Sequence, residues 1–430
     1  MAQRRKSSRR SANGHPSRSR TVPQPRRLGR VVAKRQNLWP SICGGSLLVL
    51  LFALMALSHR PEVAKASTAK AVTFSTASPE VHATINLGGS DVSPLHPRQL
   101  TFDGSRNGLW FWTSTIKSDS TVDNEIYFYD IHLSHLQRWH IYSGDWSSML
   151  LAGLAIAPNG DVWVGWNHHL VDFHPADGSY QTVELPASIV YPLPSAIVAD
   201  RPTDLGVADL AVAQDGTIWI ARNGALSLTS FSPTSRSFQE RQLPVNAGDP
   251  ARLVVGPDGH IFFTTNLSAD HAGYSSEKTG DFDPRTGTTH VFNHAAFSIA
   301  VTAQGDLITS LTGSSFGIQR VTAAERASAE AQARSPVFQH VTLPFQVDDK
   351  ALAVDVHGRI WASIAGQPRI AVLDAATGVV LNEHQYSAPS VPGGPTGAYV
   401  LKHIVAMASD SQGHLWYVRI GENVIYEVDG

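Results

Sequence analysis

One motif recurs along most of this sequence: an apolar triplet, a turn centred on glycine, and a second apolar stretch that carries an aromatic residue. It is clearest as LAIAPNGDVWV from Leu154, LAVAQDGTIWI from Leu210 and LVVGPDGHIFF from Leu253. Four further copies begin near Leu100, Ile299, Leu352 and Met407. Seven copies at intervals of 43 to 56 residues predict a propeller or a solenoid.

Each copy has the pattern of two paired strands. The short apolar run predicts an inner strand, and Asn-Gly or Asp-Gly supplies the positive φ angles of a tight hairpin turn. The second strand carries its aromatic at a fixed offset, as expected of a side chain wedged between neighbouring sheets. These aromatics are Trp163, Trp219, Phe262, Trp361 and Trp416. Third and fourth strands follow, as in HLVDFHPADG and then YQTVELP.

The last copy stops after three strands, at VIYEVDG. The folded part begins with a lone strand, VHATINL from Val81 to Leu87, which has the pattern of a fourth strand. Pairing of the two would close a ring and remove an exposed sheet edge. We therefore predict an all-β, seven-bladed β-propeller of four-stranded blades over residues 80–430. The alternative is a series of small β-sandwiches, which the lack of linkers disfavours. In the fifth unit, an Ala-rich insert from Val321 to Pro336 favours a short helix.

The N-terminal part differs in kind from the repeats. Residues 1–37 hold 12 Lys or Arg and no acid, which predicts a disordered basic arm. Residues 38–58 follow with an uncharged apolar run long enough for one transmembrane helix. The positive-inside rule then places the arm in the cytoplasm and the rest outside, with 59–79 as a flexible stalk. The alternative is secretion after cleavage near Ala66, because Ala64-Lys65-Ala66 fits a signal-peptidase site.

Composition excludes some classes of site. Beyond the arm there remain 22 basic residues against 36 acidic ones, so no basic surface for nucleic acid is expected. The one cysteine, Cys43, lies in the apolar run, so neither an intramolecular disulfide nor a multi-cysteine zinc site is possible. No phosphate loop, GxSxG elbow or metal-ligand spacing is present, and Asp281 with Asp283 has the pattern of a turn. The sequence therefore predicts no metal site and no cofactor.

Propellers usually bind ligands on the loops that lead into the inner strands, where side chains from every blade converge. The polar residues just before the apolar triplets form a mixed-charge ring. They are His96, Arg98, Asp209, Arg252, Asp349, Lys350, Lys402 and His403. Such a ring can hold an anionic or zwitterionic ligand, or place His403 as an acid or base near Asp349. Alternatively, the charges neutralise one another and solvate the channel.

The units LAVAQDGTIWI and LVVGPDGHIFF resemble the repeats of the streptogramin (virginiamycin B) lyase-like propellers and, more distantly, those of NHL and gluconolactonase-type propellers. That family opens a cyclic depsipeptide lactone with a His base and a Mg²⁺ ion held by Glu. Its strands typically run Trp-Phe-Thr-Glu, whereas here the corresponding runs end in Arg222, Thr265 and Arg419. His403 is also out of phase with the family's His. The resemblance therefore implies the fold, but it assigns no catalytic residue here.

The leading interpretation is a membrane-anchored, extracytoplasmic propeller that binds a small molecule or an envelope protein without catalysis, and that is a monomer. A lyase or lactone-processing enzyme, which would need Mg²⁺, is the alternative. A structural protein of the cell envelope is the third possibility.

Overall fold

The structure is a computed structural model of the chain. The described residues are 81–87, 94–95, 99–116, 121–145, 151–186, 206–222, 224–244, 247–265, 278–292, 296, 298–311, 317–365, 367–386, 391–392, 399–400, 404–419 and 422–429. All belong to the unit that runs from Thr73 to Gly430. The predicted arm (1–37), transmembrane helix (38–58) and stalk (59–79) lie outside these residues. Within the described part of the chain, no helix is long and apolar enough to span a membrane.

Seven antiparallel sheets form the unit, which confirms the predicted seven-bladed propeller. Numbered in chain order, blade 1 contains β3 (Leu100–Asp103), β4 (Gly108–Ile116), β5 (Thr121–Asp130) and β6 (His135–Asp145); blade 2, β7 (Leu151–Ile156), β8 (Val162–Trp166), β9 (His169–His174) and β10 (Ser179–Glu184); blade 3, β11 (Val207–Val212), β12 (Ile218–Arg222), β13 (Ser227–Ser232) and β14 (Ser237–Gln242); and blade 4, β15 (Pro250–Val255), β16 (Ile261–Thr265), β17 (Thr279–Asp283) and β18 (Thr288–Phe292). Blade 5 contains β19 (Ile299–Val301), β20 (Leu307–Ser310), β21 (Gly317–Val321) and β22 (Gln339–Thr342); blade 6, β23 (Val347–Val354), β24 (Arg359–Ile364), β25 (Arg369–Asp374) and β26 (Val380–Gln385); and blade 7, β29 (Ile404–Ser409), β30 (Leu415–Arg419) and β31 (Val424–Val428).

The seventh blade is completed from the other end of the chain, as predicted. Strand β1 (Val81–Asn86) pairs antiparallel with β31, with Thr84 opposite Tyr426 and Ile85 opposite Ile425. Ile85 is buried in the apolar cluster between blades 7 and 1. Three short strands were not predicted. The first, β2 (Pro94–Leu95), adds a fifth strand to blade 1 by pairing with β4. The short strands β27 (Val391–Pro392) and β28 (Tyr399–Val400) pair with each other.

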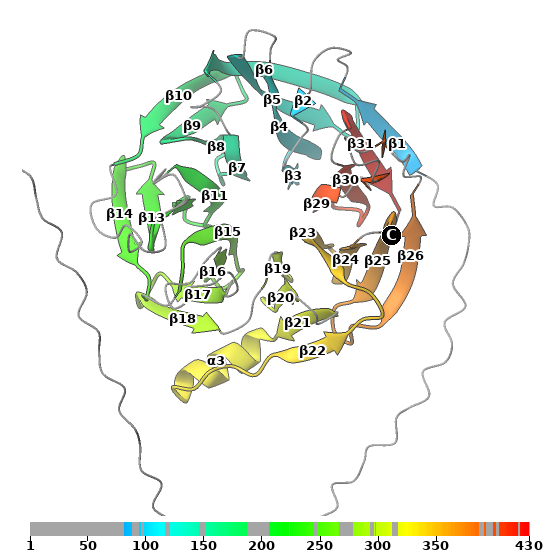
Figure 1. Cartoon of the computed structure of the whole chain (residues 1–430). Coiled ribbons are helices and arrows are strands. Elements are labelled where there is room, and N and C mark those ends of the chain that lie inside the picture. The colour runs from blue at the N-terminus through cyan, green and yellow to red at the C-terminus, as the bar shows by residue number, and fades with distance from the viewer. Residues whose placement is uncertain are drawn as a thin grey trace, which may run out of the picture. The chain divides into compact units, whose positions relative to one another are not determined.

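The first strand of each blade faces the centre. In Figure 1, β3, β7, β11, β15, β19, β23 and β29 surround the axis of the ring, and each contacts the next around the full circle, with β29 contacting β3. The strands that start a blade therefore begin close to one another at one mouth of the channel.

The core lies between the blades, and it explains the repeated aromatics. Trp163, Trp219 and Phe262 are at most 5% exposed, and each packs against residues of the following blade. In the fifth unit Ile308 takes this position and packs against blade 6. Because each aromatic is shared between two sheets, its burial couples the blades around the ring.

In blades 1, 6 and 7 an aromatic of the second strand also fixes its own hairpin; in blade 1 this residue is Trp110, on β4 opposite Thr101 of β3. The indole Nε1 atoms of Trp110, Trp361 and Trp416 donate to Asp103, Asp355 and Asp410 at 3.0, 2.9 and 3.0 Å. In blade 1 the hairpin differs from the aligned motif. Asn107, with a φ of 49°, takes the left-handed turn position, and Gly108 is already the first residue of β4.

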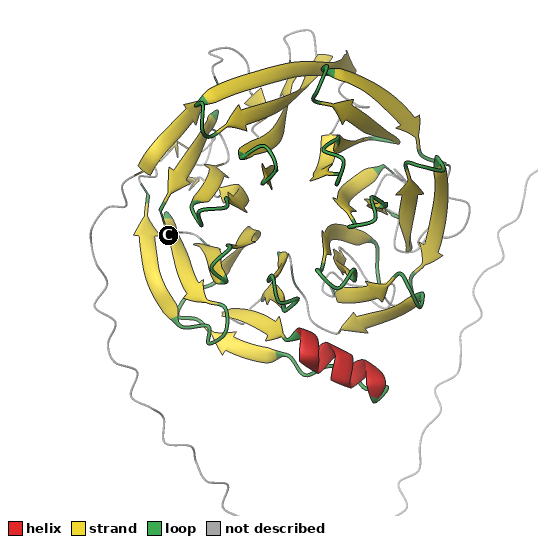
Figure 2. Cartoon of the chain, turned by 180° about the vertical axis from the view of Figure 1, so that it is seen from behind, coloured by secondary structure: helices red, strands yellow, loops and turns green. Residues whose placement is uncertain are grey.

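The Ala-rich insert forms the predicted helix, α3 (Ala323–Ala331), between β21 and β22. Figure 2 shows it as the one helix among the described residues, lying at the outer edge of the ring. Thr322 caps its N-terminus by accepting a hydrogen bond from the Glu325 amide at 3.1 Å.

Candidate functional site

A cavity of about 170 Å³ lies at the mouth of the channel where the inner strands begin. Six of the seven blades contribute to it. Its lining residues are Gln99, Leu100, Asp209, Arg252, Leu253, Ser298, Ile299, Leu352, Val405, Ala406 and Met407. The structure thus brings two of the predicted residues, Asp209 and Arg252, together in one cavity.

Asp209 is a structural residue of this mouth. Its Oδ1 accepts from the Leu210 amide at 2.9 Å, and its Oδ2 accepts from the Leu253 amide at 3.0 Å. The carboxyl group therefore joins the inner strands of blades 3 and 4. Burial raises the pKa of Asp209, although the Arg252 charge and the two amides act in the opposite direction. With both oxygens engaged, Asp209 is poorly placed to bind a ligand.

Gln99 has a similar role between blades 1 and 2. Its Nε2 donates to the Leu154 carbonyl at 3.1 Å, and the hydroxyl of Thr101 donates to the same carbonyl at 3.3 Å. Polar side chains at this mouth therefore serve largely to hold neighbouring blades together.

Arg252 is different. Arg252 lies on β15, beside Asp209 of β11, and is partly exposed. It has no hydrogen-bond or ion-pair partner among the described residues. Its guanidinium carries five N–H donors in a planar arrangement that matches a carboxylate or phosphate. Arg252 is thus the charged group of the cavity that remains available to a ligand.

The other predicted residues are not placed at this cavity. His96, Arg98, Lys402 and His403 lie outside the described residues. Asp349 and Lys350 belong to the backbone of β23, and their side chains are not described.

The strand position at which the lyase-like repeats carry Glu is described in all seven blades here. Its residues are Thr113, Trp166, Arg222, Thr265, Leu311, Ile364 and Arg419. Arg222 is 1% exposed and donates to Glu240 at 3.3 Å, while Arg419 donates to Glu422 at 2.6 Å. Buried guanidinium groups and an absence of carboxylates at this position do not fit a Mg²⁺ ion held there.

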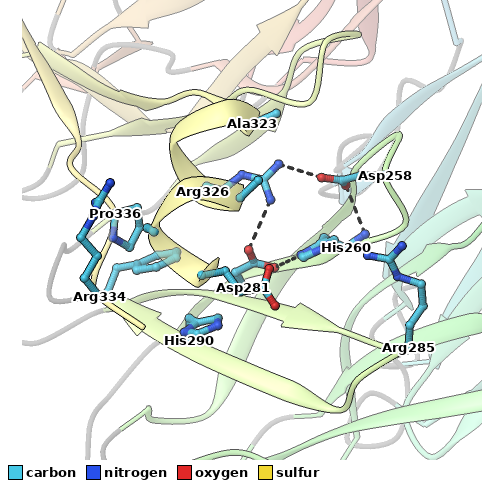
Figure 3. A pocket seen from close by; sticks show the side chains of 13 residues that line it. Asp258, His260, Asp281, Arg285, His290, Ala323, Arg326, Arg334 and Pro336 are labelled. Atoms are coloured by element: carbon cyan, nitrogen blue, oxygen red, sulfur yellow. Dashed lines mark hydrogen bonds and ion pairs between the residues drawn. The ribbon is translucent and has the colours of Figure 1, made fainter. Parts of the chain in front are cut away.

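A second cavity, of about 190 Å³, lies at the outer side of the ring between blade 4 and α3. Figure 3 shows Arg326 of α3 reaching from the helix to two carboxylates of blade 4. It donates to Asp258 at 2.9 Å and to Asp281 at 3.3 Å, and its guanidinium carbon lies 4.4 Å from the centre of the Phe262 ring. The helix insert therefore docks on blade 4 through one buried cation.

The same site contains a buried histidine. His260 Nδ1 lies 2.7 Å from Oδ1 of Asp281, and this hydrogen bond raises the pKa of His260, more than burial lowers it. The bond to Arg326 helps to hold the pKa of Asp258 below its usual range, against the effect of burial. The expected turn begins only at Asp283, which accepts from the Arg285 amide at 2.9 Å; Asp281 instead belongs to strand β17.

The histidine–aspartate site of blade 4 was not predicted from the sequence, although acidic residues recur at the same strand position in three blades. In blades 2, 4 and 7 the residue of the third strand opposite the repeated aromatic is acidic: Asp172 opposite Trp163, Asp281 opposite Phe262 and Glu427 opposite Trp416. A histidine lies beside each of these acids. We call the place where this third-strand residue lies against the turn of the first hairpin the blade corner.

No protein-family model matches the chain, and no curated protein does. Among solved structures, a streptogramin B lyase is similar with a TM-score of 0.58 and 15% identity over 81% of this chain and 97% of that protein. Virginiamycin B lyase from Staphylococcus aureus gives 0.57 and 14%, over 81% and 99%. Hydrazine synthase of Kuenenia stuttgartiensis gives 0.53 and 11%, over 80% and 98%. The predicted resemblance to streptogramin lyase-like propellers is thus confirmed at the level of the fold, which proteins of unrelated function share.

Proposed function

We propose that this propeller binds a small carboxylate-bearing ligand at the channel mouth and does so without catalysis. The observation that carries the proposal is Arg252, a partly exposed cation without a hydrogen-bonded partner in the described structure, on the wall of a cavity lined by six blades. Guanidinium and carboxylate groups form paired, charge-assisted hydrogen bonds. At about 170 Å³ the cavity fits an acidic group or a small acid.

The arginines at the lyase strand position support a binding role over lyase chemistry. Arg222 and Arg419 are buried cations where lyase-like repeats carry the acids that hold Mg²⁺. A lyase activity would therefore need its metal and its base elsewhere. In the proposed arrangement residues 38–58 anchor the chain, and the propeller meets its ligand outside the cell.

Calorimetric titration of the full-length protein with succinate and with citrate tests the proposal, with succinamide as the uncharged analogue. We expect saturable binding of the acids and none of succinamide. Arg252→Gln should weaken binding at least about 10-fold, because one charge-assisted pair contributes about 1.5–3 kcal/mol. Arg285→Gln, an exposed arginine at the distant blade 4 corner, is the matched control and should leave binding unchanged.

Equal binding by wild type and Arg252→Gln would overturn the proposal. Mg²⁺-dependent opening of a cyclic depsipeptide lactone by the wild-type chain would replace it with the lyase alternative. Capture of a stable envelope protein by the propeller, without binding of the acids, would favour the structural role.

A further inference from the structure

The corner of blade 2 brings two carboxylates and one imidazole together on a hairpin edge away from the channel mouth. Asp161 directly precedes the second strand of the blade, β8, and Asp172 and His174 lie on β9. One possible ligand atom from each of the three lies within 4.8 Å of the others. His174 Nδ1 is 2.9 Å from Asp161 Oδ1, and His174 Nε2 is 3.9 Å from Asp172 Oδ2.

One carboxylate oxygen of the buried member of this cluster lacks a hydrogen-bond partner among the described residues. Asp172 is 7% exposed, and its Oδ2 accepts one hydrogen bond from Gln181 at 3.1 Å. Its Oδ1 is fully buried and has no hydrogen-bond partner in the part of the chain that the structure describes. Buried carboxylate oxygens are normally satisfied, so an orphaned one indicates a missing group. Burial, together with repulsion from Asp161, raises the pKa of Asp172 even though His174 acts in the opposite direction.

The equivalent corners of the other blades show what the missing group is. In blade 4, Arg326 occupies the space between Asp258 and Asp281 and satisfies both. In blade 7, Asp410 accepts hydrogen bonds from Trp416, His414 and Gln412, so both of its oxygens are engaged. In blade 5, Arg320 pairs with Asp306. Each of these corners contains its own donors, and three of the five groups named here, Arg326, His414 and Arg320, are cationic or can become so.

Among the described residues no arginine or lysine forms an ion pair with Asp161 or Asp172. Arg236 of blade 3 is connected to Asp172 only through Gln181, which accepts from Arg236 at 3.2 Å and donates to Asp172. His174 is the remaining candidate, but it meets Asp161 and leaves Oδ1 of Asp172 without a partner. The charge of the two acids is therefore compensated incompletely within the described protein.

We propose that Asp161, Asp172 and His174 bind a divalent first-row transition metal ion such as Zn²⁺. One nitrogen and carboxylate oxygens are a donor set that such ions accept, whereas Ca²⁺ takes six to eight oxygens. Donors of one ion at bond lengths of about 2.1 Å lie about 3 Å apart, close to the present separation of His174 from Asp161. The two carboxylates balance the charge of the ion. The side chains of His174 and Asp161 are 32% and 21% exposed, which leaves access for the ion and for a bound water. This site is independent of the channel mouth.

The test is calorimetric titration of the full-length, metal-stripped protein with ZnCl₂. Wild type should bind one more equivalent of Zn²⁺ than either Asp172→Asn or His174→Gln. In these two variants, binding at the blade 2 corner should be at least about 100-fold weaker. Glu427→Gln alters the residue at the same strand position in blade 7 and should retain the full stoichiometry. The unfolding temperature of each metal-free variant is measured in parallel, and Asp172→Asn should match wild type there.

Equal stoichiometry and affinity in wild type and Asp172→Asn would overturn the proposal. So would a loss of the equivalent in Glu427→Gln with retention in Asp172→Asn, because the ion would then belong to blade 7. Substitution of Co²⁺ for Zn²⁺ gives a second readout: wild type, but not His174→Gln, should show the visible absorption of nitrogen-coordinated Co²⁺.

Discussion

The corners of blades 2 and 4 are built on the same plan but are completed differently. Each places an aspartate opposite the repeated aromatic and a histidine beside it, and in each the histidine nitrogen lies within 2.9 Å of a carboxylate oxygen. In blade 4 the insert of the next blade supplies Arg326, and both oxygens of Asp281 are engaged. In blade 2 no helix among the described residues covers the corner, and within them Oδ1 of Asp172 has no hydrogen-bond partner. A repeated scaffold can thus close one corner with its own cation and leave another open to an ion from solution.

Loss of the internal cation should have the largest effect. Arg326→Ala removes a side chain that is 5% exposed and leaves Asp258 and Asp281 without their shared cation. Breaking a buried ion pair from one side typically costs about 3–5 kcal/mol, and we expect a loss of that size in the free energy of unfolding by denaturant.

Arg285→Ala is the matched control for this comparison. Arg285 also pairs with an aspartate of blade 4, but its side chain is 74% exposed, so its loss should cost less than about 1 kcal/mol. Equal effects of the two substitutions would show that α3 does not dock through Arg326.

Neutralising the two equivalent aspartates should separate the corners. Asp281→Asn removes the negative charge that His260 and Arg326 share and turns one of its two acceptor oxygens into an NH2 donor. It should destabilise the metal-free protein by about 3 kcal/mol or more. Asp172→Asn removes a buried charge that raises the energy of the folded state, and it should change stability by less than about 1 kcal/mol in either direction. Urea unfolding of both variants in the presence of a chelator measures the difference. A loss of several kcal/mol from Asp172→Asn would mean that His174 alone already completes the blade 2 corner.

The pH dependence of stability gives a smaller test of the closed corner. The hydrogen bond from His260 to Asp281 raises the pKa of His260 in the folded protein above its unfolded value of about 6.5. The folded state therefore holds the proton more tightly than the unfolded state does. This contribution is fully present below about pH 6.5 and is lost as the pH rises through the folded pKa.

Free energies of unfolding between pH 5.5 and 8.5 should therefore differ most between wild type and His260→Gln at the acidic end. The difference should shrink toward alkaline pH. A difference that grows with pH would indicate that His260 is neutral in the folded state.

Much of the fold could be predicted from the sequence because the repeat encodes local structure. Each Gly turn specifies a hairpin, the fixed offset of residues such as Trp163 specifies a shared interface, and counting strands predicts the pairing of Val81–Asn86 with the last blade. The position of β2 was not predictable, because no periodic pattern marks a two-residue strand.

The sites were predictable only in part. Strand order placed Asp209 and Arg252 at the mouth, but the use of Asp209 as a link between blades depends on the amide of Leu253 in the next sheet. A blade corner brings together residues of the first hairpin and of the third strand. Which residues meet there depends on strand register rather than on their spacing along the chain. Arg326 comes from an insert that shares no pattern with the repeats, and only its packing shows that it completes blade 4.

The difference between the corners of blades 2 and 4, one taking its cation from solution and the other carrying its own, can be measured directly in crystals grown with Zn²⁺. X-ray diffraction data are collected above and below the zinc absorption edge. We expect an anomalous difference peak among Asp161, Asp172 and His174, and none between His260 and Asp281. A peak at the blade 4 corner, or none at the blade 2 corner, would contradict this expectation.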